Sequence, residues 1–255
     1  MPRAVLLCVL LLSGCIWNYA AFAADAPKPV ILLDPGHNPL NGGAISIRGI
    51  YEVDYNDRFA ARLTEALQKA AFHVELTRQP GQSIPLKARA ELANSLKPDL
   101  FLSLHHDSAQ LIYLDKFTLN EKTVYRTKKK IAGYSIFVSR DNAQFNHSWL
   151  FAQQLGKHLS ELGRQPTLHH AENIPGENRE LLDEKLGIYR FDELVVLKNT
   201  KIPAVLLEIG VIVDEDDEAY ISSRKNQEMM IQAIVEASKM TMEGMKQSDQ
   251  EQHMH

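Results

Sequence analysis

The sequence predicts an α/β fold, with a single domain whose mostly parallel, mixed sheet is covered by helices on both faces. Two observations carry this prediction. Short apolar runs of strand length alternate with longer segments in which apolar residues recur at helical spacing. No internal repeat or low-complexity linker divides the chain after its first residues. Such alternation favours parallel strands joined by helical crossovers, and 255 residues suffice to bury a substantial core.

Each predicted element rests on its local pattern. In the first helical segment Phe59, Leu63, Leu67 and Ala70 recur on one face, and in the second Pro85 stands at an early helical position. The predicted helices are 55–71, 85–96, 148–162 and 229–245. The predicted strands are 30–33, 73–77, 99–107, 134–140, 193–199 and 204–210.

Three segments depart from the alternation. Residues 110–130 alternate weakly and predict a hairpin insertion. Residues 164–187 are polar and rich in acids, and we expect this insertion to cover part of the domain. The last residues, 248–255, are predicted to form a disordered tail.

The first 23 residues have the pattern of an export signal. Arg3 precedes a short apolar run, and Ala21-Phe22-Ala23 matches the cleavage pattern of a secretory signal peptide. A competing reading is a lipoprotein signal ending before Cys15, which would become a lipidated N-terminus. Both readings export the protein to the periplasm and leave no transmembrane segment after processing; we favour cleavage after Ala23, with residues 24–255 forming the domain.

Charge and cysteine content limit the partners and the metal ligands that the chain can have. The formal net charge of −4 gives no reason to expect a nucleic-acid partner. The only cysteines, Cys8 and Cys15, lie in the leader, so the processed domain has no disulfide or thiolate metal site if cleavage follows Ala23. Any zinc must then be held by His, Asp or Glu.

Polar residues follow three of the predicted strands. His37 comes just after the first strand, His105 ends the run LFLSL, and Glu208 ends the run AVLL. Glu52 lies in the loop that leaves the first of these positions. Because ligands of open α/β sheets bind outside the carboxyl ends of the strands, we expect these four side chains to converge.

This set suits one zinc ion. Zinc favours imidazole nitrogen and carboxylate oxygen, and catalytic sites use three protein ligands and an open position. His37, Glu52 and His105 would supply the ligands, and the metal would lower the pKa of its water to about 7. Glu208 is the candidate catalytic acid and base, since burial would raise its pKa toward the useful range.

Taken singly, these residues favour plainer interpretations. His37 alone would be a turn histidine, and Glu52 alone a surface or capping acid. Asp34 is expected to set the turn or to make a supporting hydrogen bond, and Arg78 and Arg89 to form ion pairs that hold the fold. Five further histidines are expected to be surface or partly buried: His73, His147, His158, His169 and His170.

Several separated motifs, in order, resemble the zinc-dependent N-acetylmuramoyl-L-alanine amidases of bacterial cell-wall turnover. They are ILLDPGH, GIYEVDYN, LTR with LKARAELAN, DLFLSLHHDS and LKNTKIPAVLLEIGVI, between about residues 30 and 212. By this resemblance the metal ligands fall on His37, Glu52 and His105, and the catalytic glutamate on Glu208. The chain departs from the family at His106, where a small residue is usual; the spacing from Ser103 favours His105 as the ligand.

The resemblance implies hydrolysis of the amide between N-acetylmuramic acid and L-alanine in peptidoglycan or muropeptides, in cell-wall turnover or cell separation. Two alternatives stay open: a wall-binding protein that does no chemistry, and another zinc peptidase or deacetylase. The chain has no His-Glu-x-x-His pattern, and a pure binder would not need Glu208.

The acidic insertion permits one further hypothesis. In some members of the family a helix in this region covers the site and places a glutamate on zinc. A carboxylate from 172–184 could then hold the enzyme off until an activator protein moves the 164–187 segment. The plainer interpretation, which we favour, is a wall of the substrate cleft carrying solvated acids.

Overall fold

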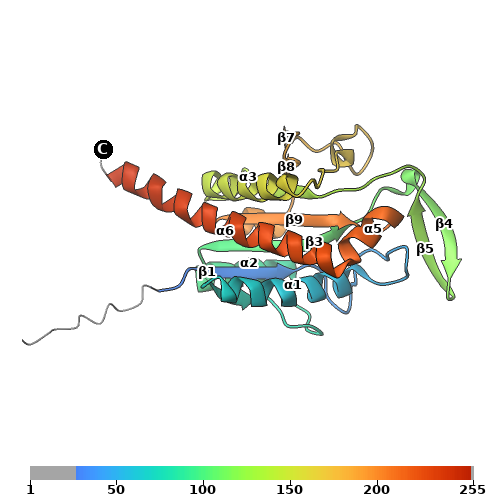
Figure 1. The fold of residues 1–255 in the computed structure, drawn as a ribbon, viewed down its shortest axis with the longest axis horizontal. Helices are drawn as coiled ribbons and strands as arrows, with labels where there is room; N and C mark the ends of the chain where they lie inside the picture. Colours follow the sequence, from blue (N-terminus) through green and yellow to red (C-terminus); the bar gives the residue numbers. More distant parts are fainter. Residues whose placement is uncertain (1–26, 254–255) are drawn as a thin grey trace, which may run out of the picture.

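The computed structural model describes residues 27–253, so the predicted leader and Cys15 lie outside the described part. Its centre is a seven-stranded sheet, shown in Figure 1. β1 pairs in parallel with β2 and β3, β3 in parallel with β9, and β6 in parallel with β8. β6 runs antiparallel to β9, and β7 antiparallel to β8. In spatial order the strands are β2 (His73–Leu76), β1 (Val30–Pro35), β3 (Leu100–Asp107), β9 (Ala204–Val211), β6 (Ser135–Val138), β8 (Ile188–Arg190) and β7 (Leu181–Asp183).

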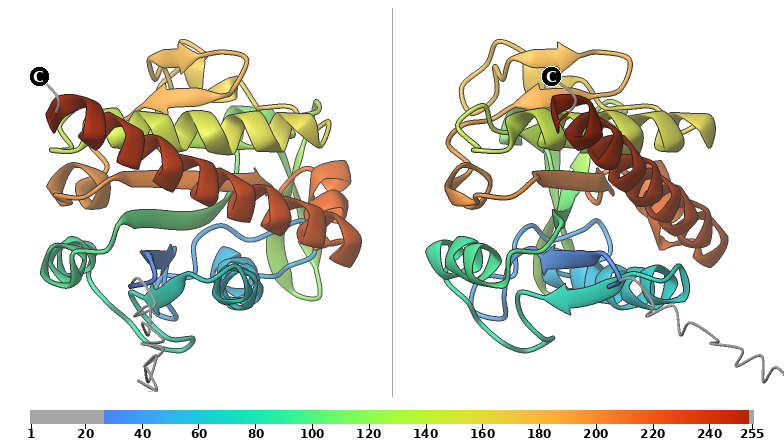
Figure 2. Two further views of the ribbon diagram at one scale, coloured as in Figure 1. Left: turned by 60° about the vertical axis from the view of Figure 1, so that its left-hand side comes forward. Right: turned by 90° about the vertical axis from the view of Figure 1, so that its left-hand side faces the viewer.

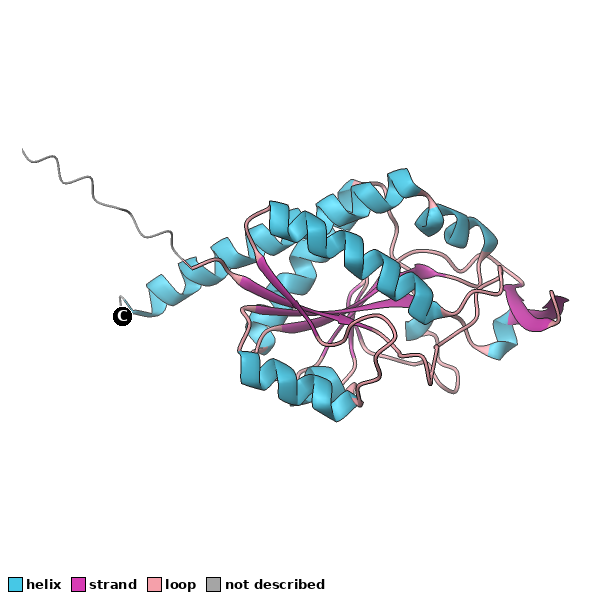
Figure 3. Ribbon diagram, turned by 90° about the horizontal axis from the view of Figure 1, so that it is seen from below, coloured by secondary structure: helices cyan, strands magenta, loops and turns pink. Residues whose placement is uncertain are grey.

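Helices cover both faces of the sheet, as the right-hand view of Figure 2 and Figure 3 show. One face packs on α1 (Glu52–Lys69), α3 (Phe145–Glu161) and α6 (Arg224–His253), with α5 (Glu215–Ser222) beside α6. The other face packs on α2 (Leu86–Leu96) and α4 (Val195–Asn199). The predicted fold class, a mostly parallel, mixed sheet between helices, is confirmed.

The central ladder brings the predicted site residues to one edge. In the β1–β3 pair Pro35 lies opposite Leu104, and in the β3–β9 pair His105 lies opposite Glu208. The three strands are buried along nearly their whole length, which explains their continuous apolar runs. Their carboxyl ends therefore lie side by side, as strand direction alone predicted.

The strand predicted at 193–199 is wrong. Residues 195–199 form the short helix α4, in which Leu197 is buried while Val195 is exposed. The amide of Asn142 donates to the backbone oxygens of Leu197 and Thr200, and so binds carbonyls that the end of the helix leaves without partners. A short apolar run does not separate strand from helix by periodicity, and the tertiary contact decides it.

The ends of the chain and its insertions differ in how well they were predicted. The predicted hairpin is present: β4 (Leu114–Leu119) and β5 (Lys122–Thr127) form a separate antiparallel pair after the turn η1 (Leu111–Tyr113). The prediction of a disordered tail is wrong up to residue 253, because polar helix formers continue α6 beyond its apolar stripe.

Among the described helices, none is long and apolar enough to cross a membrane.

Candidate metal centre

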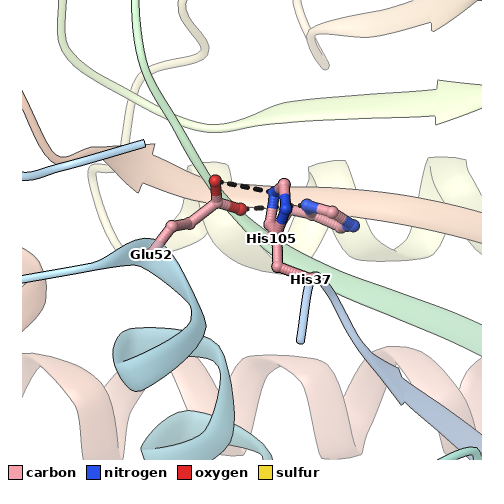
Figure 4. Close-up of side chains that lie close together, drawn as sticks. All are labelled: His37, Glu52 and His105. Atoms are coloured by element: carbon pink, nitrogen blue, oxygen red, sulfur yellow. Dashed lines mark hydrogen bonds and ion pairs between the residues drawn. The ribbon is translucent and has the colours of Figure 1, made fainter. Parts of the chain in front are cut away.

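The three predicted metal ligands lie together at the carboxyl edge of the sheet (Figure 4). His37 follows β1, Glu52 opens α1 and His105 lies in β3. Glu52 Oε2 is 2.8 Å from His37 Nε2, and Glu52 Oε1 is 2.9 Å from His105 Nδ1. One potential ligand atom of each residue lies within 4.8 Å of the other two, so the group is compact enough to hold one ion.

Two buried arginines hold the turn that carries His37. This residue has a left-handed backbone, with φ 61°, which a residue with a side chain seldom adopts. Its carbonyl oxygen accepts from Arg78 Nε at 2.9 Å and Arg89 Nη2 at 2.7 Å. Arg89 also pairs with Asp34 at 2.6 Å, and Arg78 with Asp57 at 2.7 Å. The two arginines form ion pairs as expected, and these fix the backbone of a candidate ligand.

The Glu52 carboxylate is oriented by more than the two imidazoles. It accepts from the backbone N–H of Ala44 at 3.3 Å and of His106 at 3.2 Å, and from the Asn56 amide at 3.2 Å. Burial opposes its ionisation, but the hydrogen bonds from the imidazoles keep its pKa below the ordinary value. Its place in the first turn of α1 also favours a negative charge. Glu52 is therefore an ionised carboxylate in the form that a metal requires.

His106 points away from this group. Its Nδ1 lies 2.7 Å from Asn56 Oδ1, and its ring packs 5.4 Å from that of Tyr55 and 6.2 Å from that of Phe59. Burial lowers its pKa to about 3, so the ring is neutral. Because successive side chains of β3 face opposite ways, only His105 of this pair reaches Glu52 and His37.

Two glycines let the backbone pack directly on the three side chains. A Cβ added at Gly36 would lie 2.3 Å from the His105 ring. A Cβ at Gly43, whose φ is +75°, would lie 2.4 Å from Glu52 Oε2 and 2.7 Å from His37 Cδ2. This close cradle and the donor set, two imidazoles and one carboxylate, fit zinc.

Glu208 lies on β9 beside His105. Burial raises its pKa well above the ordinary value, and the negative charges of Asp107 and Glu52 raise it further. Glu208 Oε2 is buried and has no hydrogen-bond partner among residues 27–253. A carboxyl group in this state holds its proton at higher pH than usual and can exchange it with a bound molecule.

Two adjoining pockets lie beside Glu208 and the two candidate histidine ligands. One part, about 270 Å³, is lined by Glu208, Asp107, Gln110, His170 and Arg179 among others. The other, about 410 Å³, contains His37, His105 and Arg89. Leu194 and Leu206 line both parts, so the two parts adjoin, with Glu208 in the first and His37 and His105 in the second; together they are called the cleft below.

The acidic insertion forms a wall of this cleft. Glu177 lies 2.8 Å from His170 and 2.7 Å from Arg179, and Glu172 pairs with Tyr113 and with Lys129. Within the described chain, no carboxylate of 172–184 joins the group of His37, Glu52 and His105. The insertion thus takes the position expected of a cleft wall, and does not plug the site in this conformation.

One cluster was missed from the sequence. Asp107, His169 and His170 form a second compact group of potential metal ligands, and both histidines are buried. The sequence signals were a second His-His pair and an acid directly after the first pair. Neither signal reveals proximity, because the fold alone brings residues 107 and 169 together.

Comparisons with known proteins identify the class. The family model for N-acetylmuramoyl-L-alanine amidases matches residues 31–239, and the chain belongs to this family. The probable cell wall amidase LytH of Staphylococcus epidermidis is 29% identical over 211 residues, which cover 82% of this chain and 57% of LytH. The chain therefore spans little more than half the length of the curated relatives that it matches.

Solved structures share the fold. The catalytic domain of CwlV, an N-acetylmuramoyl-L-alanine amidase from Bacillus (Paenibacillus) polymyxa var. colistinus, matches with a TM-score of 0.63 and 23% identity, over 85% of this chain and 99% of CwlV. The CwlD amidase of Clostridioides difficile, solved in complex with the GerS lipoprotein, matches with a TM-score of 0.63 and 19% identity, over 85% and 99% of the two chains. These likenesses agree with the fold described above.

Proposed function

We propose that this protein is a zinc-dependent N-acetylmuramoyl-L-alanine amidase, which hydrolyses the amide between N-acetylmuramic acid and L-alanine in peptidoglycan or muropeptides. One observation carries the proposal. In a chain of this family, His37, Glu52 and His105 converge at the edge where Glu208 stands on the neighbouring strand. We further propose that the three converging residues bind one zinc ion and that Glu208 is the catalytic residue.

The residues divide the chemistry between them. A zinc ion held by the three ligands supplies Lewis acidity toward the amide carbonyl and the attacking water. Glu208 accepts a proton from the water and delivers it to the leaving nitrogen, so that the carbon–nitrogen bond breaks into a carboxylic acid and an amine. The raised pKa of Glu208 suits the second half of this transfer, in which the residue acts as an acid.

The buried carboxyl of Glu208 favours an enzyme over a wall-binding protein. A buried polar atom without a partner costs free energy, on the order of 1–3 kcal/mol, and natural proteins keep few of them. Glu208 Oε2 is such an atom among the described residues, and it lies beside the candidate ligand His105. A binder would gain nothing from this cost, whereas a hydrolase needs a proton carrier at this place.

The test is mass spectrometry of purified peptidoglycan after digestion by the zinc-loaded protein starting at Ala24. Release of stem peptides that begin with L-alanine, together with peptide-free glycan, is the expected result. Cleavage of a different bond would refute the assignment of the amide, and no cleavage by zinc-loaded protein would favour the binding alternative. The Glu208→Gln variant is the control for contaminating hydrolases.

We also propose that the protein is exported to the periplasm, with residues 1–23 as its signal peptide. The relative LytH is described as a probable cell wall amidase, which fits an exported protein. Intact-mass analysis of the protein from cells distinguishes the two leaders: a chain starting at Ala24 supports signal cleavage, and a lipid-modified chain starting at Cys15 supports anchoring. A full-length intracellular chain would refute both.

A partner acting on 164–187 is the last part of the proposal. CwlD is a structural neighbour that was solved with the lipoprotein GerS, and in this chain His170, Glu177 and Arg179 of the 164–187 segment line the pocket of Glu208. If a partner activates the enzyme there, peptidoglycan cleavage by the purified protein alone is slow and rises when the partner is added. Full activity without any partner would remove this idea.

A further inference from the structure

Three ionisable side chains meet beside the pocket that Glu208 lines. Asp107 ends β3, and His169 and His170 belong to the 3₁₀ turn η2 (His169–Ala171) of the acidic insertion. Asp107 Oδ2 lies 2.8 Å from His170 Nε2 and 3.5 Å from His169 Nε2. The centroids of the two rings lie 3.9 Å apart, and both Nε2 atoms lie within 3.5 Å of the same carboxylate oxygen.

The outer nitrogens of both rings are occupied. His169 Nδ1 lies 2.8 Å from Thr167 Oγ1, and His170 Nδ1 lies 2.8 Å from Glu177 Oε2. Glu177 is itself held by Arg179 at 2.7 Å and by Gln110 at 3.0 Å. Metal-binding histidines have this arrangement, in which one ring nitrogen is fixed by a hydroxyl or carboxylate and the other is directed at the metal.

One ring nitrogen in the cluster lacks a hydrogen bond. His169 Nε2 is buried and has no hydrogen-bond partner among the described residues, and the side chain is only 3% exposed. An ordinary buried ion pair accounts for His170, which lies between Asp107 and Glu177. Such an ion pair does not account for His169, because its Nε2 faces Asp107 at 3.5 Å without forming a hydrogen bond.

We propose that Asp107, His169 and His170 bind a second divalent cation of the zinc class. Two imidazole nitrogens and one carboxylate oxygen are donors that such a cation prefers, and they come within 4.8 Å of one another. The site is distinct from the first, because Asp107 stands two residues beyond His105 on β3 and both histidines come from another segment. It does not depend on the proposed amidase activity.

The second cation would fasten the insertion to the sheet. Its ligands join the end of β3 to residues 169–170, and Asp107 and His170 both line the pocket of Glu208. With the cation bound, the cleft wall that carries Glu177 and Arg179 is tied to a strand beside the reacting carboxyl. The site would thus act by fixing the shape of the cleft.

The experiment counts bound zinc. The protein and its variants are loaded with Zn²⁺, dialysed and measured by inductively coupled plasma mass spectrometry. His169→Asn removes Nε2 while its amide can keep the contact with Thr167. The matched control is His158→Asn on α3, whose Nδ1 makes a comparable 2.9 Å contact with the carbonyl oxygen of Gln154. The double variant His37→Ala/His105→Ala removes the first site.

The expected zinc content is two ions per chain for the natural protein and for His158→Asn, one for His169→Asn, and one for the double variant. A natural protein with one ion and a double variant with none would overturn the proposal, whether or not the protein cleaves peptidoglycan. Unchanged zinc content in His169→Asn would also overturn it. If His169→Asn does not fold, the double variant tests the proposal instead. One zinc ion retained by the double variant, together with a zinc-dependent rise in its Tm, can come only from a site outside the first.

Discussion

Arg89 of α2 donates from Nη2 to the carbonyl oxygen of His37 at 2.7 Å, although 52 residues separate the two in the chain. Its Nη1 binds Asp34 at 2.6 Å, so one buried guanidinium joins the end of β1 to the turn beyond it. Asp34 is held in turn by Thr77 at 2.6 Å and Ser103 at 2.8 Å. The position of a candidate metal ligand therefore depends on the packing of a helix that contains no ligand.

Arg89→Met tests this dependence. The substitution leaves Asp34 buried without its cation, and we expect the free energy of unfolding to fall by about 3–5 kcal/mol. Zinc affinity should weaken as well, because the left-handed turn of His37 loses a donor. Urea unfolding and chelator competition measure the two effects. Arg62→Met, which breaks the 3.2 Å pair with the half-exposed Glu228, should cost about 1 kcal/mol or less.

Gly43→Ala should damage the metal site more than the fold. The new Cβ would meet the Glu52 carboxylate and the His37 ring at under 3 Å, so these side chains must move and zinc affinity should fall at least tenfold. Gly81→Ala is the matched control: its φ is +82°, but a Cβ there meets nothing within 4 Å. Both variants should lose about 1–2 kcal/mol from backbone strain, and only Gly43→Ala should lose zinc. Equal zinc affinity in the two would refute the close cradle.

Replacing each histidine of the pair on β3 should separate metal binding from packing. His105→Ala should lose the zinc of the first site with little change in the free energy of unfolding of the metal-free protein. His106→Ala should keep that zinc but lose about 2–4 kcal/mol, because it leaves a cavity among Tyr55, Phe59 and Asn56. Metal analysis and urea unfolding decide between them, and loss of zinc from His106→Ala alone would reverse the assignment.

Glu208→Gln should keep zinc and lose turnover. The amide has the shape of the carboxyl but cannot carry the proton, so we expect kcat to fall about 10²–10⁴-fold. Release of stem peptides at a fixed zinc content measures the loss. The exposed Glu184→Gln should leave the rate unchanged. A near-normal rate in Glu208→Gln would exclude the residue from the reaction.

The metal-free protein should become less stable as the solution turns alkaline. Burial opposes the charge on His170, but Asp107 and Glu177 outweigh it and raise its pKa from 6.5 to about 9. The stabilisation is complete below pH 6.5 and is lost as the pH rises through 9, on the order of 1–3 kcal/mol. Urea unfolding in a chelating buffer between pH 6 and pH 10 measures it. His170→Asn should lack this decline, and an equal decline in both proteins would assign it to another group.

The sequence predicted that His37, Glu52, His105 and Glu208 lie at one edge of the sheet, because the direction of each strand can be inferred from it. Apolar runs located β1, β3 and β9, and the polar residue after or within each run pointed to the same edge. Their convergence could be predicted because the position of each residue follows from its place on or directly after a buried strand. His37 needed no knowledge of distant contacts, since the turn that carries it directly follows β1.

The errors arose where distant contacts decide the local structure. The run at 193–199 has strand composition but is a helix held by Asn142. The insertion that contains His169 has no periodic pattern to show which way it folds over the sheet. Its contact with Asp107 joins segments more than sixty residues apart, and nothing in the local sequence encodes that pairing.

The order of the strands separates the parts of the domain that must stay fixed from those that can vary. His37, His105 and Glu208 belong to β1, β3 and β9 or the turn beside them, in the middle of the sheet, and Glu52 opens α1, which packs on β1 and β3, whereas the cleft wall precedes the β7–β8 edge. A chimera that exchanges residues 164–187 between related chains should change which wall fragments are cut while leaving the reaction intact. On the proposed function, exchange of this edge would alter which substrates the cleft accepts and would leave the candidate metal ligands and Glu208 in place.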